Sequence, residues 1–300
     1  SFRSIPPRTL RRLCVPFASW RNRDDPEPEG ELETRKLAFD RSGSLMVMVS
    51  PGIPDIFRHG FTTKSGGISP APFDGLNLGD KWGDTPENVA ENRRRVAQAS
   101  GASVILAVSQ VHGTRVLRVS AGADPSRVRQ EEADGLCTDA VGLGLTVHVA
   151  DCVPVLMADG RTGACAALHA GWRGAVAGMG PAGVAAMVAN FGCDPRDLRV
   201  ALGPCIGPCC FEVGPEVADQ VEAAWPGARA AGIVIQFGQR RPHVDLRLLL
   251  QWQLAHAGVP LQHIDATKAC TFCDPAQRFY SYRRAGRRTG QMVGFIVRVR

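Results

Sequence analysis

The chain has 300 residues, 44% of them hydrophobic and 21% charged, which is enough apolar material for a sizeable core. These proportions exclude a wholly disordered chain, a collagen and a coiled coil, and no apolar run reaches the roughly 18–20 residues that span a bilayer. The formal charge of +6 comes largely from the ends, since residues 1–23 and 278–300 hold six and seven Arg and no acidic residue. Because the rest is slightly acidic and carries no basic stripe interleaved with aromatics, neither a nucleic-acid nor a membrane partner is expected.

Residues 1–43 differ in composition from the remainder and predict a flexible N-terminal extension. The acid-free run SFRSIPPRTLRRLCVPFASWRNR is followed by the acidic stretch DDPEPEGELE, which is rich in proline. An arginine-rich start also resembles a transit peptide, although a solvated tail is the favoured interpretation. Residues 44–300 contain no internal repeat and no second shift in composition, so a single domain is expected there.

Within this domain, short apolar runs alternate with turns and a few helices. The clearest helix covers 84–101, with Thr85 as N-cap, Pro86 in the first turn and Gly101 at the end. Many short strands with segregated helices favour an α+β fold over a regular βαβ alternation. Strands are predicted over 45–49, 104–108, 114–119, 145–149, 154–158, 164–168, 198–202 and 291–299, and further helices over 173–191, from 215 onward and over 245–257.

Ten cysteines are present, two of them adjacent at Cys209 and Cys210. Adjacent cysteines cannot both join distant segments without strain, and the chain is long and lacks a signal-peptide pattern. Reduced thiols in a cytoplasmic protein are therefore expected.

Three reactive residues stand where predicted strands give way to turns: His112 in SQVHGT, Cys152 in VADCVPV and His169 in LHAGWRG. They lie 40 and 17 residues apart, so no local metal motif links them, and three unrelated buried residues would be the simpler interpretation. If they converge, two imidazoles and one thiolate match a catalytic zinc site with an open fourth position. Asp151 could orient a ligand or accept a proton, or it could cap a turn.

Seven blocks of sequence appear in order and carry a family resemblance. They resemble the bacterial laccase-domain (polyphenol oxidase-like) type of the purine nucleoside phosphorylase family, over residues 44–300. The resemblance implies an α+β fold, with a mixed β-sandwich and helices packed on both outer faces. The blocks are FTTKSGGIS (61–69), FDGLNLGDKWGDTPENVAENRRR (73–95), SQVHGTRV (109–116), VADCVPVL (149–156), ALHAGWRGAVAGM (167–179), ALGPCIGPCCFEVGPEV (201–217) and CTFCDPAQRFYSYRRAGRRTGQM (270–292).

The resemblance also implies a metal site and a reaction. It places metal ligands on His112, Cys152 and His169, with Zn²⁺ as the cofactor and Cu²⁺ as a substitute. The implied partners are purine nucleosides and inorganic phosphate. The implied reactions are phosphorolysis of adenosine, inosine and 5′-methylthioadenosine, with a secondary adenosine deaminase activity. We expect a monomer or a small homo-oligomer.

Three further residues are candidates for substrate binding. Arg173, four residues beyond His169, offers a guanidinium fork to phosphate at the start of the helix predicted over 173–191. Asn77 could bind the ribose or the purine edge, or serve as a turn residue. Lys64 stands where the family commonly has Arg, so a single ammonium would replace a bidentate phosphate contact. Tyr282 and the arginines that follow it could line the phosphate side.

Other functions remain compatible with these residues. A multicopper phenol oxidase needs about ten histidines, and this chain has seven. An oxidase that uses a single copper ion is therefore the form of this alternative to test. Cys152 with a histidine base would also suit a thiol hydrolase or a cell-wall precursor amidase. A metal-storage or scaffold module would show no turnover.

Overall fold

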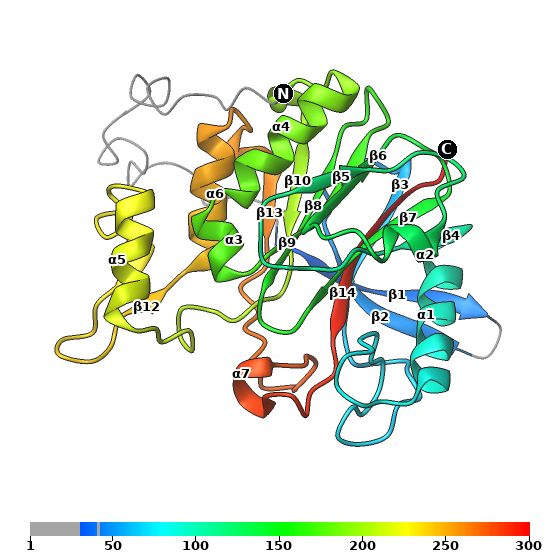
Figure 1. Ribbon diagram of the computed structural model, residues 1–300, viewed down its shortest axis with the longest axis horizontal. Helices are drawn as coiled ribbons and strands as arrows, with labels where there is room; N and C mark the ends of the chain where they lie inside the picture. The colour runs from blue at the N-terminus through cyan, green and yellow to red at the C-terminus, as the bar shows by residue number, and fades with distance from the viewer. Residues whose placement is uncertain (1–30, 41–42) are drawn as a thin grey trace.

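Two six-stranded mixed sheets, packed face to face, form the body of the molecule (Figure 1). The computed structural model describes residues 31–300 except 41–42. The first sheet has the strand order β1-β2-β3-β14-β7-β4, the second has β13-β10-β8-β9-β6-β5, and β11 pairs with β12 in a separate ribbon. The strands are β1 (Glu33–Asp40), β2 (Gly43–Val49), β3 (Phe57–Thr62), β4 (Val104–Leu106), β5 (Val116–Arg118), β6 (Gly135–Thr138), β7 (Leu143–Val149), β8 (Val153–Ala158), β9 (Cys165–Ala170), β10 (Arg199–Leu202), β11 (Val234–Ile235), β12 (His243–Val244), β13 (Ile264–Ala266) and β14 (Met292–Arg298).

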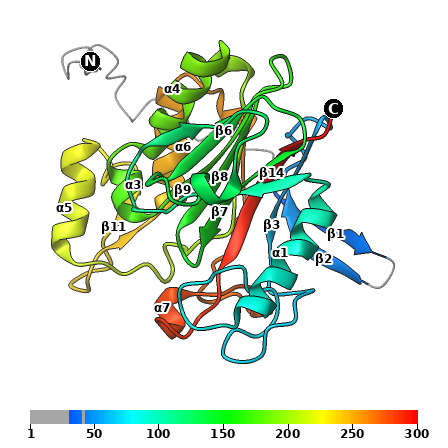
Figure 2. The same cartoon turned by 45° about the vertical axis from the view of Figure 1, so that its right-hand side comes forward.

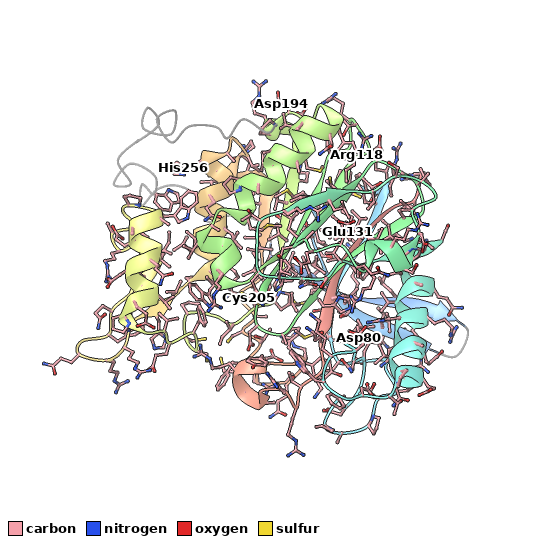
Figure 3. All side chains as sticks on the ribbon, viewed as in Figure 1. Asp80, Arg118, Glu131, Asp194, Cys205 and His256 are labelled. Carbon is pink, nitrogen blue, oxygen red and sulfur yellow. The ribbon has the colours of Figure 1, made fainter. Side chains whose placement is uncertain are left out.

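The core between the sheets is built from strands β7 and β14 on one side and β8 and β9 on the other. Leu145 and Ile296 pack there with Leu156 and Ala167, and all four side chains are fully buried. Strands β8 and β9 are buried along their whole length because helices cover their second face. That double burial explains their continuous apolar sequence, which lacks the polar alternation of a half-exposed strand. Side chains fill the space between the layers (Figure 3).

Helices cover both outer faces of the sandwich. Helix α1 packs on the first sheet through Val96 and Ala99, whereas α3, α4 and α6 pack on the second (Figure 2). The predicted α+β sandwich with helices on both faces is therefore confirmed. No helix in the described part of the chain is both long and apolar enough to cross a membrane. The helices are α1 (Pro86–Ser100), α2 (Pro125–Val128), α3 (Trp172–Val176), α4 (Met179–Phe191), α5 (Pro215–Ala224), α6 (Leu246–His256) and α7 (Tyr282–Ala285).

Local capping signals located α1 correctly, but the single helix predicted over 173–191 is wrong. Thr85 accepts a hydrogen bond from the Asn88 amide at the start of α1, and Gly101 adopts a left-handed conformation at its end. The segment after His169 instead forms α3 and α4, separated by Gly178 with φ of 93°. A left-handed residue cannot continue an α-helix, so the chain changes direction there.

The N-terminal segment also differs from expectation. Strand β1 lies within the predicted extension, yet it pairs antiparallel with β2 from Glu33 to Asp40. Its polar residues suit an edge strand, where only one ladder of backbone hydrogen bonds is needed. Residues 1–30, including the arginine-rich run, lie outside the described residues, so the domain boundary remains a prediction.

Candidate metal centre and cavity

His112, Cys152 and His169 meet at one point of the structure. Their ligand atoms all lie within 4.8 Å of one another, and the two imidazole centroids are 4.9 Å apart. The register of the second sheet explains part of this arrangement, because Pro154 of β8 pairs with His169 of β9 and Cys152 immediately precedes β8. His112 arrives from the loop between β4 and β5. The structure thus brings together three residues that are distant along the chain.

A buried carboxylate, that of Asp134, orients two of these residues. Its Oδ1 accepts hydrogen bonds from His169 Nδ1 at 2.8 Å and from the His112 amide at 3.0 Å. Its Oδ2 accepts from the amides of Val111 and Gly113, at 3.2 and 2.6 Å. These bonds hold His112 in a left-handed conformation, with φ of 62°, that is unfavourable for a side chain with a Cβ.

The bond to Asp134 also fixes which ring nitrogen of His169 faces the other two residues. With Nδ1–H donating to the carboxylate, Nε2 is left to face Cys152 and His112. Burial of His169 disfavours its charged form, but Cys152 and Asp134 together raise its pKa to about 9. Partial burial and the charge of His169 lower the pKa of His112. A carboxylate behind a histidine ligand is a common feature of protein zinc sites.

Close approach of the three side chains depends on a glycine. A Cβ built on Gly171 would lie 2.4 Å from His112 Nδ1 and 3.2 Å from Cys152 Sγ. The first distance is too short for any side chain, so position 171 must stay without one. This glycine is part of the block HAGWRG that carried the sequence resemblance.

The three residues lie in the wall of a cavity of about 540 Å³. The cavity combines positive charge with aromatic surface, and it is large enough for a small organic molecule. The guanidinium of Arg173 lies 4.4 Å from the Trp172 ring centroid, and the rings of Trp82 and Tyr282 are 5.5 Å apart. The cationic lining residues are Lys81, Arg129, Arg173, Arg283 and Arg287. The aromatic lining residues, apart from the histidines, are Trp82, Trp172, Phe211 and Tyr282.

Comparison with known families decides the classification. Residues 58–299 match the family described as multi-copper polyphenol oxidoreductase laccase. The chain belongs to this laccase family. It is 38% identical over 263 residues to mouse "Purine nucleoside phosphorylase LACC1", covering 85% of this chain and 58% of the length of that relative.

Two further members of the laccase family match over nearly their whole length. "Purine nucleoside phosphorylase Rv2149c" of Mycobacterium tuberculosis is 40% identical over 256 residues, covering 84% of this chain and 93% of the relative. The crystal structure of YlmD from Geobacillus stearothermophilus superposes with a TM-score of 0.78 at 32% identity, covering 89% of this chain and 100% of that chain. Family membership and fold are thereby established, and the relatives' names include phosphorylase activity.

The structure separates the predicted binding residues of this laccase-family chain into two groups. Arg173 borders the cavity, and within the described residues it forms no ion pair. Lys64 does not border it and instead pairs with Asp74 at 2.5 Å. Asn77 is buried away from it, donating to Gly79 and accepting a hydrogen bond from the Gln291 amide. Lys64 and Asn77 therefore contact the neighbouring loops, and their predicted part in substrate binding stays a prediction.

Sequence reasoning missed Asp134 and the role of Asp151. Asp134 stands before a short strand in EEADGL, a context that carries no distinctive signal. Asp151, with φ of 88°, accepts hydrogen bonds from Thr271, Ser281 and the Arg283 amide. It thereby fastens the C-terminal loops to the segment that carries Cys152.

Proposed function

We propose that this chain is a zinc-dependent purine nucleoside phosphorylase. Its substrates would be adenosine, inosine and 5′-methylthioadenosine together with inorganic phosphate, and adenosine deamination would be a secondary activity. The observation that carries the proposal is the convergence of His112, Cys152 and His169 in the wall of a cavity that is both cationic and aromatic. The names of the curated relatives support the same reaction.

The donor set suits Zn²⁺. Two imidazoles and a thiolate would hold the ion and leave one tetrahedral position for substrate, as in catalytic sites. Asp134 supports this use by engaging His169 Nδ1, so that Nε2 is the ring nitrogen left to face the metal position. When bound, zinc would supply a Lewis acid next to the substrate.

Phosphate recognition is assigned to the lysine and arginine side chains that line the cavity, and first of all to Arg173. In phosphorolysis a phosphate oxygen forms a bond to ribose C1′ while the C1′–N9 bond breaks and its electron pair passes to the purine. The guanidinium fork of Arg173 matches two phosphate oxygens, and its stacking on Trp172 limits the positions that it can adopt. The expected contribution of a helix N-terminus is small, because α3 has only five residues.

The aromatic side chains are assigned to the purine. Trp82 and Tyr282 come from distant segments, and their tilted rings border the cavity. A purine that stacked on either ring would bury apolar surface and exclude water from the reacting carbon. Asp151 is assigned to hold the cavity wall, because its carboxylate accepts hydrogen bonds from Thr271, Ser281 and the Arg283 amide.

An assay of base release tests the proposal. Adenine or hypoxanthine released from each nucleoside should depend on added phosphate, and Cys152→Ala should lose both the turnover and the zinc of this site. Turnover at the wild-type rate by Cys152→Ala, or release independent of phosphate, would overturn the proposal. Resistance to chelators combined with inactivation by alkylation would favour a thiol hydrolase. Copper rather than zinc in protein purified without added copper would favour a single-copper oxidase.

A further inference from the structure

A second cluster of metal-ligating side chains lies outside the catalytic cavity. The sulfur atoms of Cys209, Cys210, Cys270 and Cys273 all lie within 4.8 Å of one another, and those of Cys209 and Cys273 are 3.6 Å apart. Cys209 and Cys210 come from the loop after β10, and Cys270 and Cys273 come from the loop after β13. The proposed phosphorolysis uses none of these thiols.

We infer that Cys209, Cys210, Cys270 and Cys273 bind one structural zinc ion. Four thiolates in mutual contact form a closed S₄ site, which selects Zn²⁺ or an iron–sulfur centre over hard cations. A tetrahedral ion with zinc–sulfur bonds near 2.3 Å needs sulfurs about 3.8 Å apart, close to the separation of Cys209 and Cys273. All four thiols are free in the structure.

The backbone around Cys270 is already arranged for a ligand thiolate. The amides of Gly207, Phe272 and Cys273 all donate to Cys270 Sγ, the first at 3.2 Å. Amide donors of this kind orient a sulfur ligand and offset its charge. Cys205, labelled in Figure 3, forms a β-bridge with Cys270, so the two cysteine-bearing loops run side by side.

Two arginines supply positive charge around the cluster. Four thiolates and one Zn²⁺ carry a net charge of −2, which needs compensation where it is partly buried. The buried Arg247 donates to the carbonyl of Ala269 at 2.9 Å, and its guanidinium borders Gly207 together with Cys209 Sγ. Arg284 donates to the carbonyl of Phe272 at 2.8 Å, inside the Cys-x-x-Cys turn.

Binding at this cluster would stabilise the wall of the catalytic cavity. The first loop continues into Phe211, which lines the cavity, and the second contains Thr271, whose hydroxyl donates to Asp151 at 2.6 Å. Asp151 precedes Cys152 of the catalytic centre. A zinc ion at the cluster would therefore join two loops about 60 residues apart, and each of them contacts the cavity.

Counting zinc in matched variants tests the inference. Under reducing conditions and after desalting, wild-type protein should retain two zinc ions per chain. Cys209→Ser/Cys273→Ser should retain one, Cys152→Ser should retain one, and the combined variant should retain none. Cys193→Ser is the control, because this buried thiol contacts Thr162 far from the cluster, and it should retain two. Cys209 and Cys273 are exposed, which favours folding of the double variant.

A second measurement leaves all four cysteines of the cluster in place, so it tests the inference even if the double variant does not fold. Cobalt-loaded Cys152→Ser should show the visible bands of a tetrahedral site together with strong thiolate-to-cobalt charge transfer. The inference would be overturned if wild-type protein retained only one zinc ion and Cys152→Ser lost that ion. The absence of the cobalt spectrum would overturn it too. A Cys209–Cys273 disulfide in protein purified without oxygen would overturn it as well. Two zinc ions in Cys152→Ser would instead count against the proposed catalytic site, so the two failures are distinguishable.

Discussion

Replacing Asp134 with Asn removes a negative charge from behind the candidate metal centre while side-chain volume hardly changes. In the wild-type structure both carboxylate oxygens accept hydrogen bonds, Oδ1 from the amide of His112 and from His169, and Oδ2 from the amides of Val111 and Gly113. An asparagine offers one oxygen and one NH₂ group. In either orientation of the amide, its NH₂ group faces two N–H groups that had donated hydrogen bonds to the carboxylate.

The expected cost follows from that count. A hydrogen bond to a charged acceptor contributes about 1.5–3 kcal/mol, so the loss of two should lower the free energy of unfolding by about 3–6 kcal/mol. The loop that carries His112 also loses the contact that supports its left-handed conformation. Removal of a carboxylate behind a metal ligand typically weakens metal binding by about 10–100-fold, and the same range is expected for zinc here.

Asp159→Asn is the matched control. Asp159 is also fully buried, and its Oδ1 accepts from the amides of Arg161 and Thr162, whereas its Oδ2 accepts no hydrogen bond and lies 3.6 Å from the Arg161 guanidinium in an ion pair. Asparagine keeps both bonds to Oδ1 and loses only the charge that pairs with Arg161, whose side chain is largely exposed. We therefore expect a loss of about 1 kcal/mol and unchanged zinc affinity.

Denaturant unfolding measures the change in stability. Competition with a chelator, followed through the loss of phosphorolysis, measures the change in zinc affinity. The reasoning would be refuted if Asp134→Asn bound zinc within twofold of wild type and unfolded at the same denaturant concentration as Asp159→Asn. Loss of stability without loss of zinc affinity would confine Asp134 to a structural role.

Three further predictions concern Gly171, Arg173, which is proposed to bind phosphate, and the buried His148. Gly171→Ala places a methyl group against His112, so turnover should fall by at least about 100-fold and zinc should be lost. Arg173→Ala should raise the apparent KM for phosphate about tenfold with deamination largely spared, whereas Arg161→Ala, remote from the cavity, should change neither. Burial lowers the pKa of His148 to about 3, so the unfolded chain binds a proton that the folded chain does not below pH 6.5. Between pH 6.5 and pH 5 the wild type should therefore lose about 2 kcal/mol more stability than His148→Gln, as measured by denaturant unfolding at each pH.

Each of these outcomes has a clear contrary result. Zinc-loaded, active Gly171→Ala would mean that the three ligands do not need the observed close approach. Equal loss of phosphorolysis and deamination in Arg173→Ala would contradict a role specific to phosphate. Parallel stability profiles for the wild type and His148→Gln would show that His148 does not remain neutral in the fold.

Short-range signals in the sequence determined several local elements. Helix α1 could be located from Thr85, Pro86 and Gly101, because capping depends on residues within one turn of the helix end. The strands β7, β8 and β9 followed from apolar runs at nearly the same positions. The family resemblance of three separate blocks, which contain His112, Cys152 and His169, pointed to the residues that the structure brings together.

Other features depended on long-range contacts that no local pattern encodes. Asp134 has no distinctive neighbours, and it became a candidate only when folding placed its carboxylate against His169 and the loop of His112. The pairs Cys209–Cys210 and Cys270–Cys273 are visible in the sequence, but they form a four-sulfur cluster only because two loops lie side by side. Hydrogen bonding and metal binding act over a few ångströms in space, whatever the separation along the chain. The sequence alone therefore determined the local elements and the reactive residues, and the tertiary structure decided which of those residues act together.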